Sequence, residues 1–285
     1  MAEPVAAHEL AVSAAIHRWS VLARVPAAPR AALLWLPALG VAARHYLPFA
    51  DALAARGVAV FVHEWRGIGS SNLRAGRTSD WGYRELLLED LPASEHAVRG
   101  ALPNVPLLLG GHSLGGQLAC CHLALQERMP SALWLVASGA PYWRAFPPPH
   151  RYLLPLAYRF LPWLARTCGA LPGRRIGFGG EEARTLIADW ARTALSGRYA
   201  VDGLDVDLEA GMTRARIPVA GVVLRNDWLA PRSSLAFLLG KLPNATHVVA
   251  ELDDAALGTR ADHFAWMKQP DAVVAALVAC AAVDG

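Results

Sequence analysis

One short segment, residues 107–119, constrains the fold more than any other part of the chain. It reads LLLGGHSLGGQLA, so Ser113 stands between two pairs of glycines, after an aliphatic run and before a helix-like one. Gly111 and Gly115 remove side chains that would collide in a sharp turn from strand to helix. Such a turn strains the serine and exposes its oxygen above a sheet, beside a base that activates it. The segment therefore predicts a nucleophilic serine on an α/β fold.

Short apolar runs alternate with helical spacing on both sides of this segment. The runs typical of strands are residues 31–36, 58–62, 105–109, 132–137, 217–224 and 247–252. Helical spacing is found at residues 45–56, 83–99, 114–128, 231–239 and 269–283. Strands that are apolar throughout are typical of a mostly parallel twisted sheet with helices on both faces. Residues 8–25 partly alternate and predict a half-exposed hairpin at the sheet edge.

This rhythm breaks between residues 141 and 212, where prolines and large aromatic side chains gather. We interpret residues 141–212 as an inserted helical lid, with the α/β core made by residues 1–140 and 213–285. Four aromatic residues of the lid are predicted to bind substrate: Trp143, Tyr152, Tyr158 and Trp163. Such side chains can line an apolar tunnel, although an inserted helical layer also needs apolar contacts with the core.

The composition excludes several classes of protein. With 54% hydrophobic and 18% charged residues, 285 residues can bury one large core, or one core with an inserted subdomain, and disorder is excluded for most of the chain. The net charge of +3 comes from scattered arginines, so we expect no nucleic-acid partner. The four cysteines lack zinc spacing, and neither a metal nor a cofactor is expected. No apolar run is long enough to span a bilayer, although association with a membrane surface stays open. The first ten residues do not resemble a secretion signal, which favours a cytoplasmic location.

A serine nucleophile of this kind needs a histidine as base and an acid that orients the histidine. On the α/β-hydrolase fold these follow the serine in the order acid, then histidine. Asp227 lies in the loop that leaves a late strand, which is the expected place for the acid. Only His247 and His263 come after it, and His247 falls within a predicted strand. We therefore predict Ser113 as nucleophile, Asp227 as acid and His263 as base.

The negative charge that develops on the substrate oxygen has to be met by two backbone amides. Leu114 directly follows the serine and supplies the first. The second is expected from the loop Pro37-Ala38-Leu39-Gly40, in which Pro37 has no N–H to donate. Leu39 is the predicted donor.

These motifs resemble the α/β-hydrolase superfamily, in the branch that contains serine aminopeptidases, monoacylglycerol lipases and related bacterial hydrolases. The resemblance rests on residues 36–40, HEWRGIGSS at 63–71, the turn at Ser113, DWLAP at 227–231 and DHF at 262–264. It implies the same three catalytic residues and the same two amides. The chain departs from the pattern in having Pro37-Ala38 where many relatives have His-Gly. It also has Asp262 where many have glycine, which places a negative charge beside His263.

The resemblance implies hydrolysis of a small-molecule carboxylic ester through an acyl-enzyme, with an apolar acyl or acylglycerol-type substrate. Three alternatives remain open. A thioesterase would use the same triad and favour a basic entrance, for which Arg144, Arg151, Arg174 and Arg175 are candidates. An aminopeptidase would need acidic lid residues such as Glu181 or Glu182 to hold a free amine. A non-catalytic ligand-binding protein would keep the fold without turnover. A homodimer is left open.

Overall fold

The structure, a computed structural model that describes residues 5–282, is built on one eight-stranded sheet. Its strands are β1 (Val5–Ala14), β2 (His17–Pro26), β3 (Ala31–Leu36), β4 (Val58–Val62), β5 (Leu107–His112), β6 (Ala132–Val136), β9 (Pro218–Leu224) and β10 (Thr246–Leu252). Their order is β1-β2-β4-β3-β5-β6-β9-β10. All pairs from β4 to β10 are parallel, whereas β2 is antiparallel to both of its neighbours. The predicted mostly parallel sheet with an edge hairpin is confirmed.

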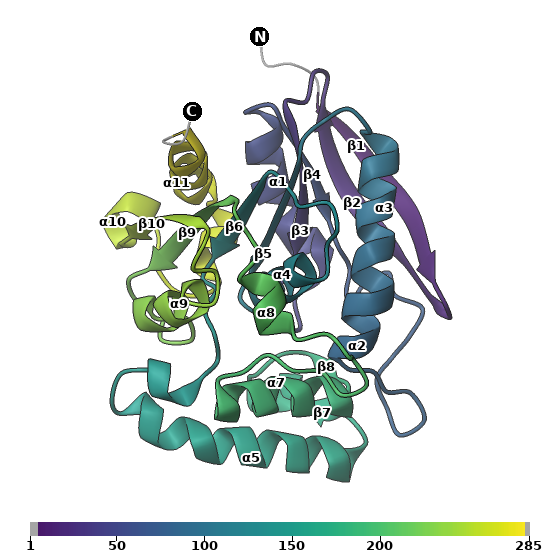
Figure 1. Cartoon of the computed structure of the whole chain (residues 1–285), viewed down its shortest axis with the longest axis vertical. Helices are drawn as coiled ribbons and strands as arrows, with labels where there is room; N and C mark the ends of the chain where they lie inside the picture. Colours follow the sequence, from purple (N-terminus) through teal and green to yellow (C-terminus); the bar gives the residue numbers. More distant parts are fainter. Residues whose placement is uncertain (1–4, 283–285) are drawn as a thin grey trace.

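Helices cover both faces of this sheet (Figure 1). One face carries α1 (Leu47–Ala54) and α11 (Asp271–Ala282), and the other carries α3 (Leu91–Ala101), α4 (Leu114–Ala124), α8 (Leu208–Met212) and α9 (Arg232–Leu239). Side chains alternate along β3, so Leu34 and Leu36 pack toward α4 while Trp35 packs toward α1.

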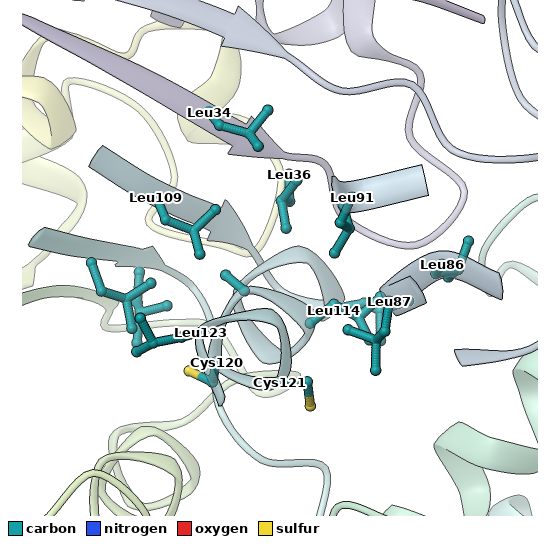
Figure 2. Close-up of a cluster of buried hydrophobic side chains, with 14 of the residues drawn as sticks. Leu34, Leu36, Leu86, Leu87, Leu91, Leu109, Leu114, Cys120, Cys121 and Leu123 are labelled. Atoms are coloured by element: carbon teal, nitrogen blue, oxygen red, sulfur yellow. The ribbon is translucent and has the colours of Figure 1, made fainter. Parts of the chain in front are cut away.

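Figure 2 shows leucines of β3 and β5 gathered around α4, which carries two buried free thiols, Cys120 and Cys121. Burial raises the pKa of Cys120 to about 12, so this thiol is structural.

Several short elements connect these layers. They are η1 (Ala43–Tyr46), α2 (Tyr83–Glu85), the π-helical turn η2 (Leu86–Asp90), α10 (Asp254–Leu257) and η4 (Ala265–Lys268). The helix predicted at 83–99 is thus α2, η2 and α3 in succession. Pro92 lies in the first turn of α3 and has no N–H to continue a regular α-helical ladder from η2. The helix predicted at 114–128 ends at Ala124, and the predicted end of the last helix at residue 283 lies outside the described residues.

Most of the segment between β6 and β9, up to the end of α7, forms a separate layer beyond the carboxyl edge of the sheet (Figure 1). It contains η3 (Trp143–Ala145), α5 (His150–Cys168), β7 (Leu171–Pro172), α6 (Gly173–Ile176), β8 (Glu181–Glu182) and α7 (Arg184–Ser196), followed by α8. Side chains after α7, from Tyr199 to Met212, pack into the main core beside α4. None of the helices within residues 5–282 has the length and apolarity to cross a membrane.

Candidate active site

Ser113 occupies a strained turn between β5 and α4. Its φ of 56° and ψ of −120° lie in a region that side-chain-bearing residues rarely adopt. The surrounding glycines are required by close backbone contacts. A Cβ at Gly111 would lie 2.3 Å from the carbonyl carbon of Gly115, and one at Gly115 would lie 2.0 Å from the carbonyl oxygen of Leu36. The turn therefore has the geometry that the glycine pattern predicted.

Replacing Gly115 by alanine should destabilise the fold by about 3 kcal/mol or more, because backbone rather than a movable side chain occupies the space. The matched control is Gly100→Ala in α3, where an added Cβ meets nothing within 4 Å. That change should stabilise the protein by up to about 1 kcal/mol, because alanine favours a helix over glycine. Urea unfolding of both variants measures the two effects. Equal stability of the two variants would contradict the packing argument.

Asp227 and His263 are brought together from loops at the carboxyl edge of the sheet. His263 Nδ1 lies 2.7 Å from Asp227 Oδ2, and both side chains are buried. The other carboxylate oxygen, Oδ1, accepts the backbone N–H groups of Leu229 and Ala230 at 2.9 and 3.1 Å. Because the carboxylate only accepts, His263 carries its proton on Nδ1 and keeps Nε2 free to act as a base.

Ser113 and His263 line one cavity of about 490 Å³ between the core and the inserted layer. Its apolar lining includes Leu39, Leu114, Phe146, Leu154, Tyr158 and Leu161. Among the described residues, none that line it is Asp, Glu, Lys or Arg. Gln117, one turn after Ser113, is a buried polar residue of this mostly apolar lining. Its Oε1 has no hydrogen-bond partner within the described protein. The cavity suits an apolar, uncharged ligand with a polar group near the serine.

Ala38 and Leu39, in the loop after β3, line the same cavity. The N–H of Ala38 donates to the hydroxyl of Tyr46 at 2.8 Å, and this hydroxyl lies 2.8 Å from His112 Nδ1. Burial raises the pKa of Tyr46 and lowers that of His112, so the hydroxyl donates to a neutral ring. Within the described chain, the amides of Leu39 and Leu114 donate to no protein acceptor, and both residues line the cavity. Both amides are thus available to a substrate oxygen. Sequence reasoning missed Tyr46, whose position reads as ordinary helical core.

Only one of the four aromatic residues predicted to bind substrate reaches the cavity. Tyr158 lines it, whereas Trp143, Tyr152 and Trp163 do not. Trp143 packs against the side chains around Tyr158, and Tyr152 and Trp163 are exposed on the outer side of α5. The helical period is the reason, because it turns residues 154, 157, 158 and 161 to the cavity and residues 152 and 163 away from it. The substrate-binding prediction is corrected accordingly.

Asp262 directs its carboxylate at the backbone. Its Oδ1 accepts the N–H groups of Phe264 and Ala265 at 3.0 and 2.8 Å. Asp262, which replaces the glycine of many relatives, therefore stabilises the conformation of the loop that carries His263.

Glu182 is a buried carboxyl behind the loop after β3. It is 2% exposed, and its Oε1 accepts the N–H of Gly180 at 2.7 Å. Gly180 packs in turn against Gly40, where a Cβ would lie 2.2 Å from the Gly180 nitrogen. Neither Glu181 nor Glu182 lines the large cavity. Burial raises the pKa of Glu182 from 4.5 to about 7, because ionisation is costly in an apolar environment.

This pKa predicts a pH-dependent stability. The folded protein holds the Glu182 proton more tightly than the unfolded chain does, so stability is highest below about pH 4.5 and falls as pH rises to about 7. The full effect is of the order of 3 kcal/mol, and Glu182→Gln should remove this contribution. Urea midpoints between pH 5 and 8 measure it, with the exposed Glu181→Gln as control. A Glu182→Gln variant with the pH dependence of the native protein would contradict the prediction.

Comparisons with known proteins agree with this architecture. The family model for serine aminopeptidase, S33, matches residues 27–190. Among solved structures, a thermophilic esterase from Thermogutta terrifontis has a TM-score of 0.62 and 15% identity over 97% of this chain and 98% of that one. The enol-lactonase from Burkholderia xenovorans has a TM-score of 0.57 and 16% identity, over 98% and 100%. The thioesterase domain from the curacin biosynthetic pathway has a TM-score of 0.58 and 17% identity, over 96% and 99%. At these identities the likeness shows the α/β-hydrolase fold alone. No curated protein matches the chain in sequence.

Proposed function

Since the chain belongs to the serine aminopeptidase S33 family of α/β-hydrolases, we propose that it hydrolyses carboxylic esters of apolar acids through Ser113, His263 and Asp227. The observation that carries this proposal is the buried 2.7 Å contact between His263 Nδ1 and Asp227, with His263 and Ser113 lining one apolar cavity. A base oriented by an acid, in the same cavity as a strained serine, is the arrangement that can activate a hydroxyl.

In the proposed mechanism, Ser113 Oγ attacks the ester carbonyl while His263 Nε2 accepts its proton. The N–H groups of Leu39 and Leu114 stabilise the charge on the tetrahedral oxygen. The protonated His263 then gives its proton to the departing alcohol, leaving an acyl group on Ser113. Water activated by His263 hydrolyses this acyl-enzyme and restores the serine.

The lining favours an ester over a peptide with a free amino terminus. An ammonium group needs a carboxylate close to the scissile bond, and no described lining residue supplies one. Glu182, the buried acid of the inserted layer, is instead engaged with the Gly180 amide behind the loop. An apolar acyl chain carries no charge that has to be paired, and its transfer from water into the apolar cavity is favourable.

The proposal is tested with p-nitrophenyl esters from two to twelve carbons, beside leucine p-nitroanilide as an aminopeptidase substrate. We expect the esters to be hydrolysed, with kcat/KM rising with chain length until the cavity is filled, and the anilide to be left intact. Hydrolysis of the anilide with no turnover of any ester would refute the ester assignment.

Narrowing the cavity should shorten the preferred acyl chain. Ala157→Phe places a ring where α5 lines the cavity, at a position that is only partly buried and therefore able to accept it. We expect kcat/KM for the ten-carbon ester to fall about tenfold or more, with little change for the two-carbon ester, as steric exclusion costs about 1–3 kcal/mol. Leu153→Phe on the outer side of the same helix is the control. Equal loss for both esters would contradict this placement of the acyl chain.

A further inference from the structure

The inserted helix α5 has a second apolar face, which points away from the cavity. Five large side chains make it up, and each is between 50 and 67% exposed: Tyr152, Leu153, Leu156, Phe160 and Trp163. At 3.6 residues per turn they fall within an arc of about 100°, which makes a continuous stripe along the helix. Helix α5 is the outermost element of the inserted layer (Figure 1). A stripe of this size on the surface marks an interaction site.

The segment that carries this stripe is rich in arginine. Residues 141–180 contain six arginines and no Asp, Glu or Lys. The arginines are Arg144, Arg151, Arg159, Arg166, Arg174 and Arg175. Within residues 5–282, none of the six forms an ion pair, although most other arginines of the chain do. Residues 141–180 thus carry +6, whereas the chain as a whole carries +3. These arginines therefore favour a negatively charged partner for this face.

The apolar stripe is continuous with the entrance of the cavity. Phe160 belongs to both, since it is half exposed and also lines the cavity. Three more exposed apolar residues line the cavity: Ile176, Trp228 and Phe264. An apolar ligand could thus pass from the outer face into the site without crossing a polar rim.

We propose that this face binds the surface of an anionic lipid bilayer, with α5 lying in the plane of the headgroups. A helix with aliphatic and aromatic residues on one side and arginines beside them has the chemistry of an interfacial helix. Tyrosine and tryptophan are enriched at this depth of a membrane, and arginines are attracted by anionic headgroups. The binding itself needs no catalysis. Only the further step, in which the cavity takes its ester from the bilayer, rests on the proposed function.

The test is sedimentation of the full chain with phosphatidylcholine vesicles that contain one quarter phosphatidylglycerol, compared with phosphatidylcholine alone. We expect stronger binding to the anionic vesicles, weakened by salt. The variant Leu153→Ser/Leu156→Ser/Trp163→Ser should lower the partition coefficient at least about a hundredfold, because three apolar side chains no longer insert. Arg159→Gln/Arg166→Gln should lower it about tenfold on anionic vesicles only.

Matched controls lie on other elements. Ile16→Ser/Leu88→Ser removes exposed apolar residues, and Arg18→Gln/Arg30→Gln removes exposed arginines. Both variants should bind vesicles as the native protein does, and all variants should keep the native Tm. Ser113→Ala should also bind normally, so failure of the ester assignment and failure of membrane binding are separate results.

The proposal is overturned if the native protein binds neither vesicle or if the stripe variant binds unchanged. It is also overturned if the stripe instead holds a dimer that the triple variant dissociates.

Discussion

Ser113→Ala should lower kcat/KM for the p-nitrophenyl esters by about 10³- to 10⁶-fold, the largest effect expected from any single substitution in this chain. Alanine has no oxygen to attack the carbonyl, and the residual rate would come from the Leu39 and Leu114 amides and from binding alone. The serine side chain makes no capping hydrogen bond with α4, and alanine keeps the same Cβ in the strained turn. The Tm should therefore stay close to that of the native protein, so that lost activity reports lost chemistry.

Covalent labelling with a fluorophosphonate gives a second measure of the same prediction. The reagent should modify Ser113 in the native protein and leave Ser113→Ala unmodified, as intact mass and peptide mapping would show. Ser138→Ala is the matched control, because its hydroxyl lies beside the turn, 3.1–3.2 Å from the carbonyl oxygens of Gly111, Ser113 and Val136, any one of which can accept its proton. That variant should still be labelled at Ser113. Native activity in Ser113→Ala, or labelling at another serine, would refute the assignment of the nucleophile.

The core strands were predictable because each is a continuous apolar run that ends abruptly. The bounds of β3 and β4 agree with the sequence prediction residue for residue. Strand β5 was predicted to end at residue 109 but continues to His112 through two glycines. Glycine disfavours a strand by local propensity, but a Cβ at Gly110 would lie 2.7 Å from the Trp134 carbonyl oxygen, so the tight packing of β6 requires glycine there. Such a requirement depends on the neighbouring strand and has no signal within the segment itself.

Chain order and loop position were enough to pair Asp227 with His263, because parallel strands bring their carboxyl ends to one edge. The same reasoning could not find Tyr46, whose role depends on the proximity of its hydroxyl to Ala38 and His112 in space. The aromatic residues of the inserted helix are a different case. Their residue types alone suggested a substrate site, whereas their phase along α5 separates a cavity side from an outer stripe. That phase can be read from the sequence once the helix bounds are known.

Asp227→Asn should lower kcat by about 10⁴-fold while leaving the fold intact. The two carboxylate oxygens of Asp227 have different hydrogen-bond partners. Oδ1 accepts the Leu229 and Ala230 amides, which an asparagine oxygen can also do, and Oδ2 faces His263 Nδ1. The asparagine NH₂ group would then stand where Oδ2 stood and donate to Nδ1. The ring proton would move to Nε2, and the histidine could no longer accept the proton of Ser113.

The control for this tautomer argument is Asp262→Asn, one residue before the histidine. Its carboxylate contacts the Phe264 and Ala265 amides through Oδ1, so an asparagine oxygen replaces that contact and leaves the Asp227–His263 contact in place. We expect kcat to change by less than about tenfold in this variant, consistent with the modest worth of a single hydrogen bond. Steady-state kinetics and Tm measurements on both variants separate the two outcomes. Equal loss of activity in both would mean that general negative charge near the ring supports catalysis, rather than its orientation by Asp227.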